Sequence, residues 1–139
     1  MIPLIPGAQA ASSALEAERV RMEVISQNIA QANITRTADG KPYQRQQVVF
    51  ESVFKDALDP SAGSSVRVSQ VRADTKPPRL IYNPGHPDAD ADGMVAYPDI
   101  NIHEEMADLI VSSRAFEANL AVIRNAKHMA LQTLQIGKR

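Results

Sequence analysis

The residues best suited to chemistry by type and spacing are the aspartates of residues 88–93, DADADG. Carboxylates at alternating positions followed by glycine match the first half of a calcium loop, in which Asp88, Asp90 and Asp92 would supply oxygen ligands. The glutamate usual at the twelfth position is replaced by Asp99, whose shorter side chain reaches less well. We therefore predict a solvated acidic turn held by aspartate-to-backbone hydrogen bonds, with no bound metal, and keep the three aspartates as a weak candidate site.

Catalytic chemistry has little support elsewhere in the chain. Ser112 and Ser113 have no adjacent His-Asp arrangement, and the three histidines have no metal-ligand spacing. Glu104 and Glu105 are neighbours on a predicted helix and point to different faces, so they suit the positive helix terminus better than acid-base work. We predict no catalytic residue and no cofactor, which makes an enzyme the weakest functional class.

Composition limits the remaining classes. The 139 residues fit one domain or one elongated unit, and a net charge of -1 gives no basic field for binding nucleic acid. Aromatic residues are only 4% of the chain, so the apolar content comes mainly from aliphatic residues near the two ends. No stretch approaches the roughly 20 apolar residues of a transmembrane helix, so we expect no direct membrane insertion.

The first residues do not form a secretory signal peptide. No positive region precedes the apolar run Ile2 to Ile5, and Pro3 interrupts that run well short of the roughly 7–15 residues that such a leader needs. If the chain leaves the cytoplasm, we expect export without a cleaved leader.

A first helix is predicted from Ala10 to Asn33, because apolar residues recur there at steps of three and four and the segment contains no Pro or Gly. Glu18 is the single polar interruption of the stripe, and Asn33 is expected to stop the helix in a left-handed conformation. The stripe comprises Ala8, Ala11, Leu15, Met22, Ile25, Ile29 and Ala32.

A second helix is predicted from Ile102 to Ile136. Asn101 and Glu104 have the spacing of a capping box at its start, and Gly137 is the expected terminator. Its apolar seam, broken by Ser113 and Lys127, comprises Met106, Leu109, Phe116, Leu120, Ile123, Ala130 and Leu134.

The middle of the chain is predicted to form short β-hairpins, because Pro and Gly punctuate β-branched runs there. The segment Pro60 to Ser65 (PSAGSS) is expected to form a mobile loop, because its small polar residues can bury little surface. The candidate strands are Gln46–Phe54, Val66–Ala73, Arg79–Tyr82 and Gly93–Tyr97.

The predicted fold class is therefore mainly α with a small β region, in which long N- and C-terminal helices form an antiparallel coiled-coil pair. The chain divides into residues 1–34, residues 35–100 and residues 101–139. Pairing the helices covers one seam of each. A further set of residues is left for neighbouring molecules: Ala14, Ala17 and Val24 on the first helix, and Ile102, Ile110 and Ala118 on the second. The alternative is that the chain is a monomeric helical hairpin on a small sheet.

Several segments together resemble a known family. Residues 14–33 (ALEAERVRMEVISQNIAQAN) and 35–51 are similar to the N-terminal segment of flagellar rod, hook and hook-associated axial proteins, and residues 97–137 are similar to their closing helix. Residues 82–98 and the short overall length resemble the proximal-rod subunits of the FlgC type in the flagellar basal-body rod family. The resemblance covers nearly the whole chain.

This resemblance implies a structural subunit of the bacterial flagellar basal-body proximal rod. Such a subunit would be exported by the flagellar type III apparatus without cleavage and would assemble through its terminal helices into a helical tube that transmits torque across the periplasm. The implied partners are copies of itself, other proximal-rod and distal-rod subunits, and the export apparatus with its rod adaptor.

Assembly contacts are expected on the two apolar stripes and at nearby polar positions. The amides Asn28, Asn33 and Asn119 either cap the helices or face water, or they fix helix register through a buried hydrogen bond. Arg114 is expected to pair with Glu117 or to reach a neighbour. The full expected set is Leu15, Met22, Ile25, Asn28, Ile29, Asn33, Met106, Leu109, Ile110, Arg114, Phe116, Asn119, Leu120, Ile123 and Leu134.

Two other functions compete with this hypothesis. A hook or distal-rod relative would carry a longer middle segment than this chain has. A calcium-responsive or adaptor binding module built on a helical hairpin would be a stable folded monomer with a defined ligand.

Overall fold

The computed structural model describes residues 6–54 and 64–137. Most of the loop predicted at Pro60 to Ser65 lies outside these ranges, and its last two serines begin a strand. The elements, in chain order, are α1 (Pro6–Ala30), β1 (Gln46–Phe54), β2 (Ser64–Ala73), β3 (Arg79–Tyr82), β4 (Met94–Tyr97) and α2 (Ile102–Ile136). The predicted class, mainly helical with a small β region, is confirmed.

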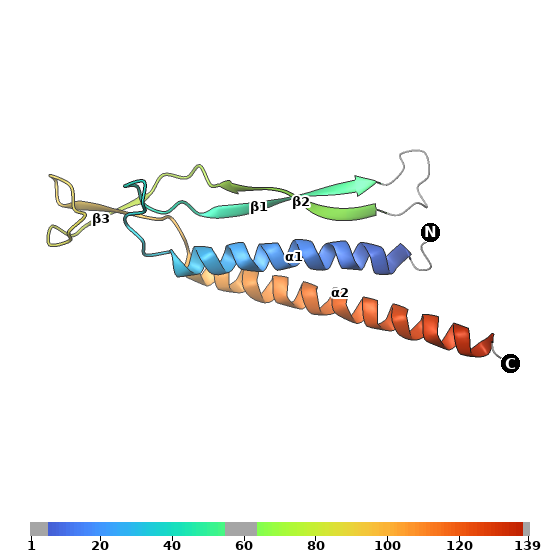
Figure 1. The fold of residues 1–139 in the computed structure, drawn as a ribbon. Helices are drawn as coiled ribbons and strands as arrows, with labels where there is room; N and C mark the ends of the chain where they lie inside the picture. Colours follow the sequence, from blue (N-terminus) through green and yellow to red (C-terminus); the bar gives the residue numbers. More distant parts are fainter. Residues whose placement is uncertain (1–5, 55–63, 138–139) are drawn as a thin grey trace.

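The two helices lie side by side and run in opposite directions, which confirms the antiparallel pair (Figure 1). α1 lies between α2 on one side and the β1–β2 hairpin on the other. α1 has 25 residues and α2 has 35, or about 37 Å and about 52 Å at 1.5 Å per residue. The C-terminal turns of α2 consequently extend past the described start of α1 (Figure 1).

The ends of α1 differ from the prediction. The helix begins at Pro6, where a proline is tolerated because the first helical N–H groups have no intrahelical acceptor. It ends at Ala30, and a turn over residues 31–33 follows, in which the Ile34 N–H donates to the Gln31 carbonyl at 3.1 Å. No non-glycine residue in the described ranges has a positive φ, so the left-handed conformation predicted for Asn33 is wrong.

The ends of α2 agree with the predicted bounds. Asn101 is the N-cap: its Oδ1 accepts from the His103 N–H at 3.1 Å, and its Nδ2 donates to Glu104 Oε1 at 3.0 Å. Asn101 and Glu104 are the two residues predicted to form a capping box. In a full capping box each side chain accepts from the backbone N–H of the other residue, whereas here the Asn101 side chain accepts from the His103 N–H and donates to the Glu104 side chain. Gly137 ends the helix with φ −73, so it needs no left-handed conformation.

The strands form two separate antiparallel hairpins. β1 pairs with β2 from Gln46–Ala73 to Phe54–Ser64, with a bulge between Val49 and Phe50, and this hairpin covers α1. β3 pairs with β4 and projects from the end of the molecule where α2 begins (Figure 1). We call residues 79–97, which include both strands and the loop between them, the arm.

The β1–β2 hairpin covers a part of α1 that the sequence analysis assigned to neighbouring molecules. Ala17 is 3% exposed and Val24 is 7% exposed, so both predictions are corrected. Ala17 lines a groove with Val66 and Val68 of β2, whereas Val24 lines one with residues of β1. On α2, by contrast, Ile102, Ile110 and Ala118 are exposed.

Gly93 holds the arm in shape. Its φ is +74, and a Cβ there would lie 2.9 Å from Tyr82 Cε2 and 3.1 Å from Pro84 Cβ. Gly93→Ala is therefore expected to destabilise the arm by about 1–3 kcal/mol through backbone strain and overlap. Faster hydrogen exchange at the Asn83 N–H, which donates to the Gly93 carbonyl, would report this. Gly85→Ala is the matched control, because its Cβ would meet nothing closer than 3.9 Å; equal exchange in both variants would contradict the prediction.

Candidate assembly site and the polar cluster that positions it

A buried amide joins both helices to the start of β1. Asn28 is 1% exposed, and its Nδ2 donates to Glu105 Oε2 at 3.0 Å and to the Gln46 carbonyl at 2.9 Å. Its Oδ1 accepts from the Gln46 N–H at 2.9 Å and from the Tyr43 hydroxyl at 3.1 Å. The amide thus makes all four of its hydrogen bonds, as a buried polar group requires.

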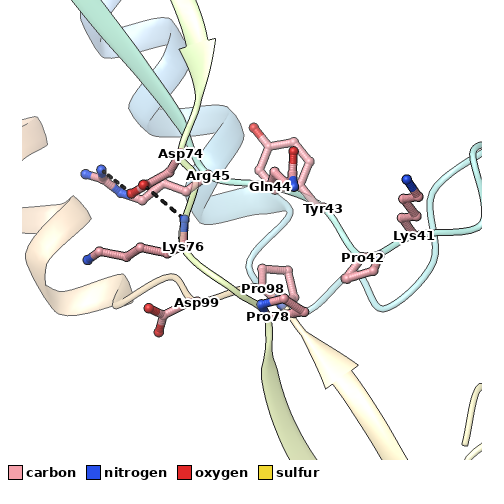
Figure 2. Close-up of a pocket in the computed structure, with 10 residues that line it drawn as sticks. All are labelled: Lys41, Pro42, Tyr43, Gln44, Arg45, Asp74, Lys76, Pro78, Pro98 and Asp99. Carbon is pink, nitrogen blue, oxygen red and sulfur yellow. Dashed lines mark hydrogen bonds and ion pairs between the residues drawn. The ribbon is translucent and has the colours of Figure 1, made fainter. Parts of the chain in front are cut away.

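Glu105 extends this cluster to the base of the hairpin. It is 1% exposed, and its Oε1 accepts from Arg45 Nε at 2.6 Å. The Arg45 guanidinium also lies 3.9 Å from Asp74 Oδ2, which accepts from Gln47 Nε2 at 3.0 Å. Figure 2 shows Arg45 beside Asp74. The charge of Glu105 is thus compensated by a cation and an amide donor, which a buried carboxylate needs.

A second polar contact crosses the helix pair further along. The Ser112 hydroxyl, fully buried, donates to a carboxylate oxygen of Glu18. Ile25 lies seven positions after Glu18, and Glu105 lies seven positions before Ser112. Ile25 and Glu105 line the same groove. Glu18 breaks the apolar stripe in sequence, but in the structure it helps to fix the register of the helices.

The α2 seam is rotated from its predicted position. Met106 is 51% exposed and Leu134 is 66% exposed, whereas Glu105, Ser112 and Ala126 are buried. The buried residues are seven and fourteen positions apart, with the partly buried Asn119 midway between Ser112 and Ala126, and this heptad spacing is the signal the sequence offered. It was missed because two of the three are polar, and a search for apolar residues alone selects the adjacent positions.

The environment of Tyr43 predicts a pH effect. Burial raises the pKa of its hydroxyl above the ordinary value near 10, and the charge of Glu105 raises that pKa further. The folded state then holds the proton after the unfolded state has lost it, so this contribution to stability is complete below about pH 10 and is lost as the pH rises through the folded pKa. We expect Tyr43→Phe to flatten the fall in stability above pH 10, measured by urea unfolding between pH 8 and 11. An unchanged slope would contradict this assignment.

The acidic loop has the hydrogen bonds expected of an acidic turn. Asp90 Oδ1 accepts from the Asp92 N–H at 3.0 Å and from the Met94 N–H at 2.8 Å. Asp88 Oδ2 accepts from the Thr35 hydroxyl at 2.8 Å, which ties the loop to the segment after α1. In the described residues, no group of three or more potential ligand side chains could hold a metal ion.

The residues expected in assembly fall into three groups. Ile25 and Asn28 are buried within the chain, where they already contact its own elements. The partly buried group is Leu15, Met22, Ile29, Leu109, Phe116, Asn119, Leu120 and Ile123. The exposed group is Asn33, Met106, Ile110, Arg114 and Leu134, and among the described residues no ion pair joins Arg114 to Glu117.

The exposed apolar residues of α2 are available for contacts with other molecules. They occur along the entire helix, from its first residue to its last, and each is at least 36% exposed. They are Ile102, Met106, Ile110, Val111, Val122, Met129, Leu131, Leu134 and Ile136. Neither described helix combines the length and hydropathy needed to cross a membrane. With about 100° of rotation per residue, the exposed apolar residues fall on two opposite sides of α2, and exposed apolar side chains in this number mark surfaces for protein contact.

Comparison with known proteins identifies the class. Residues 91–136 match the family described as flagellar basal body rod FlgEFG protein, C-terminal. A helix pair with exposed apolar side chains thus accompanies the sequence of a flagellar rod component, which is a structural protein and not an enzyme.

Curated relatives specify the family more closely. The chain is 41% identical to the flagellar basal-body rod protein FlgC of Borreliella burgdorferi, over 91% of this chain and 92% of the relative. The FlgC proteins of Salmonella typhimurium and Bacillus subtilis are 38% and 37% identical, over 92% and 91% of this chain and 93% of each relative. The chain belongs to the FlgC family of flagellar basal-body rod proteins, and its place is the flagellar basal body.

Proposed function

We propose that this chain is a subunit of the proximal rod and assembles through α1 and α2 into a helical tube that transmits torque. The observation that carries the proposal is the set of nine exposed apolar residues on α2. Burial of one such side chain contributes about 1.5–3 kcal/mol, so covering even part of this set offsets the cost of association. The calcium-module alternative lacks comparable support, because the carboxylates of Asp88 and Asp90 already accept protein hydrogen bonds.

The polar cluster gives the proposed subunit a defined shape. Asn28 and Glu105 link the two helices to β1, so that the outward side of α2 is presented at a fixed angle to the hairpin. A tube wall repeats one contact geometry many times. An angle between α1 and α2 that differed from copy to copy would prevent a regular repeat. In this proposal residues 1–34 and 101–139 form the assembling part, and residues 35–100 brace it.

The proposed partners follow from this role. They are copies of this chain, other proximal-rod and distal-rod subunits and, before assembly, the export apparatus with its rod adaptor. The proposed location is the part of the basal body that spans the periplasm, reached without a cleaved signal peptide. Neither nucleic acid nor membrane insertion has a part in the proposal.

Hydrogen exchange of the purified monomer and of isolated rods tests the proposal. We expect the last turns of α2, beyond α1, to exchange rapidly in the monomer and to become protected in rods. The amide of Gln46, which donates to Asn28 Oδ1, serves as an internal control that stays protected in both states. Full protection of both helices in a demonstrably monomeric sample, or absence of the chain from purified rods, would overturn the proposal.

A further inference from the structure

The arm has two strand edges, and they differ in how far they are protected. On β4, the carbonyl of Met94 accepts from the Asp90 N–H at 2.9 Å, and the Met94 N–H donates to Asp90 Oδ1 at 2.8 Å. On β3, each of the four residues is exposed, and within the described ranges β4 is the only strand that pairs with it. The acidic loop thus occupies the outer edge of β4 and leaves the outer edge of β3 open.

The backbone of β3 alternates between facing β4 and facing outward. The Asn83 N–H donates to the Gly93 carbonyl at 2.9 Å, so Asn83 faces β4. Neighbouring residues of an antiparallel strand face opposite edges, so Ile81 also faces β4. Leu80 and Tyr82, which lie between these positions, direct their N–H and carbonyl groups toward the open edge.

The same two residues carry the exposed apolar side chains of the arm. Leu80 is 59% exposed and Tyr82 is 69% exposed, and both lie on one face of the hairpin because they are two positions apart. On the other face, Val95 opposite Ile81 is fully buried. A hairpin of two strands has few hydrogen bonds and little apolar contact, and a third strand supplies more of both. Leu80 and Tyr82 therefore offer the backbone and side-chain groups that a third strand would use.

The uncompensated charge at this edge is positive. Arg79, the first residue of β3, is exposed and makes no ion pair among the residues that the structure describes. The hollow at the base of the arm carries both signs, because it is lined by Lys41, Arg45 and Lys76 together with Asp74 and Asp99 (Figure 2). Asp90 lies at the edge of β4, across the hairpin from the open edge. An added strand would thus meet Arg79 as its nearest unpaired charge.

We infer that the arm binds an extended segment of a partner protein, which adds to β3 as a third, antiparallel strand. Partner residues opposite Leu80 and Tyr82 exchange backbone hydrogen bonds with them and carry apolar side chains. The partner residue opposite Arg79 lies on the other face and is acidic. Because Pro78 and Pro84 flank the open edge, the segment alternates apolar and acidic residues over about five positions. The inference goes beyond the proposed rod function, which uses the two helices and not this edge.

Hydrogen exchange with a defined peptide tests the added strand. The probe is a peptide of alternating valine and glutamate with blocked ends, added at millimolar concentration to the purified full chain and followed residue by residue by NMR. We expect the Leu80 and Tyr82 N–H groups to exchange at least threefold more slowly, whereas Ile81, which faces β4, is unchanged. A peptide of the same composition with its valines and glutamates in two blocks is the control. Equal slowing at all three amides, or none at Leu80 and Tyr82, would refute the inference.

Backbone methylation of the peptide separates strand addition from simple apolar contact. The valines lie opposite Leu80 and Tyr82, so their N–H groups donate across the new pair, whereas the glutamate N–H groups face away. N-methylation of the valines is therefore expected to abolish the protection, and N-methylation of the glutamates is expected to preserve it. Both peptides keep the same side chains, so an equal effect of the two methylations would rule out an added strand.

A charge exchange tests the acidic character of the partner. Arg79→Glu is expected to weaken binding of the valine–glutamate peptide at least threefold at low salt and to favour a valine–lysine peptide instead. Unchanged preference would refute the assignment of an acidic partner. Protection of Leu80 and Tyr82 that rises with chain concentration in the absence of peptide would mean that the edge pairs with a second copy, which also contradicts the inference. These measurements use the purified chain, so their failure leaves the rod function intact.

Discussion

Glu105→Ala is expected to lower the free energy of unfolding by about 3 kcal/mol. The substitution leaves the Arg45 guanidinium and one donor of the Asn28 amide without their carboxylate partner in a buried site. Loss of one partner of a buried ion pair typically costs about 3–5 kcal/mol, and we take the low end because the Arg45 side chain is 26% exposed. Urea unfolding followed by circular dichroism measures the change.

The neighbouring residue provides the matched control. Glu104 is exposed, and within the described residues its side chain bonds only to the Asn101 side chain, so Glu104→Ala is expected to stay within about 0.5 kcal/mol of the natural chain. Glu105→Gln should fall between the two alanine variants, because it preserves the shape and an acceptor but removes the charge opposite Arg45. Equal unfolding midpoints for the Glu104 and Glu105 alanine variants would contradict the role assigned to the cluster.

Ile110→Asp combined with Leu134→Asp is expected to abolish swimming while leaving the helix content of the purified chain unchanged. Both side chains are more than half exposed, so the charges cost little in the free chain. In an assembled rod they would lie in an apolar contact, where an unpaired carboxylate is strongly unfavourable. Motility in soft agar, together with rod counts in electron micrographs, measures the outcome.

The choice of positions matters to this experiment. Sequence reasoning alone would select Ile25 and Leu120, but Ile25 is 6% exposed, and an aspartate there would disturb the packing of the chain itself. Gln132→Asp is the control for Leu134→Asp, because it adds one negative charge at an exposed polar position on the same end of α2. Normal swimming of the double variant would mean that these residues do not enter the assembly contact.

Much of the fold could be predicted because it is encoded locally. The bounds of α2, β1 and β3 agree with the predicted ranges, since capping residues, β-branched runs and flanking Pro or Gly act over a few positions. Assignment to the flagellar rod family was also accessible from sequence, because motifs near both ends occur together. The start of α1 was less accessible, since Pro6 can either precede a helix or occupy its first turn.

The sequence by itself determined two long helices, short hairpins between them and membership of the rod family. Only the tertiary structure decided which faces are covered: the β1–β2 hairpin packs on Ala17 and Val24, and Glu105 and Ser112 replace apolar residues on the helix seam. The physical reason is that a polar side chain becomes buried when its partners come from distant segments. Asn28 and Glu105 are separated by 77 positions, and no local pattern reveals that they meet.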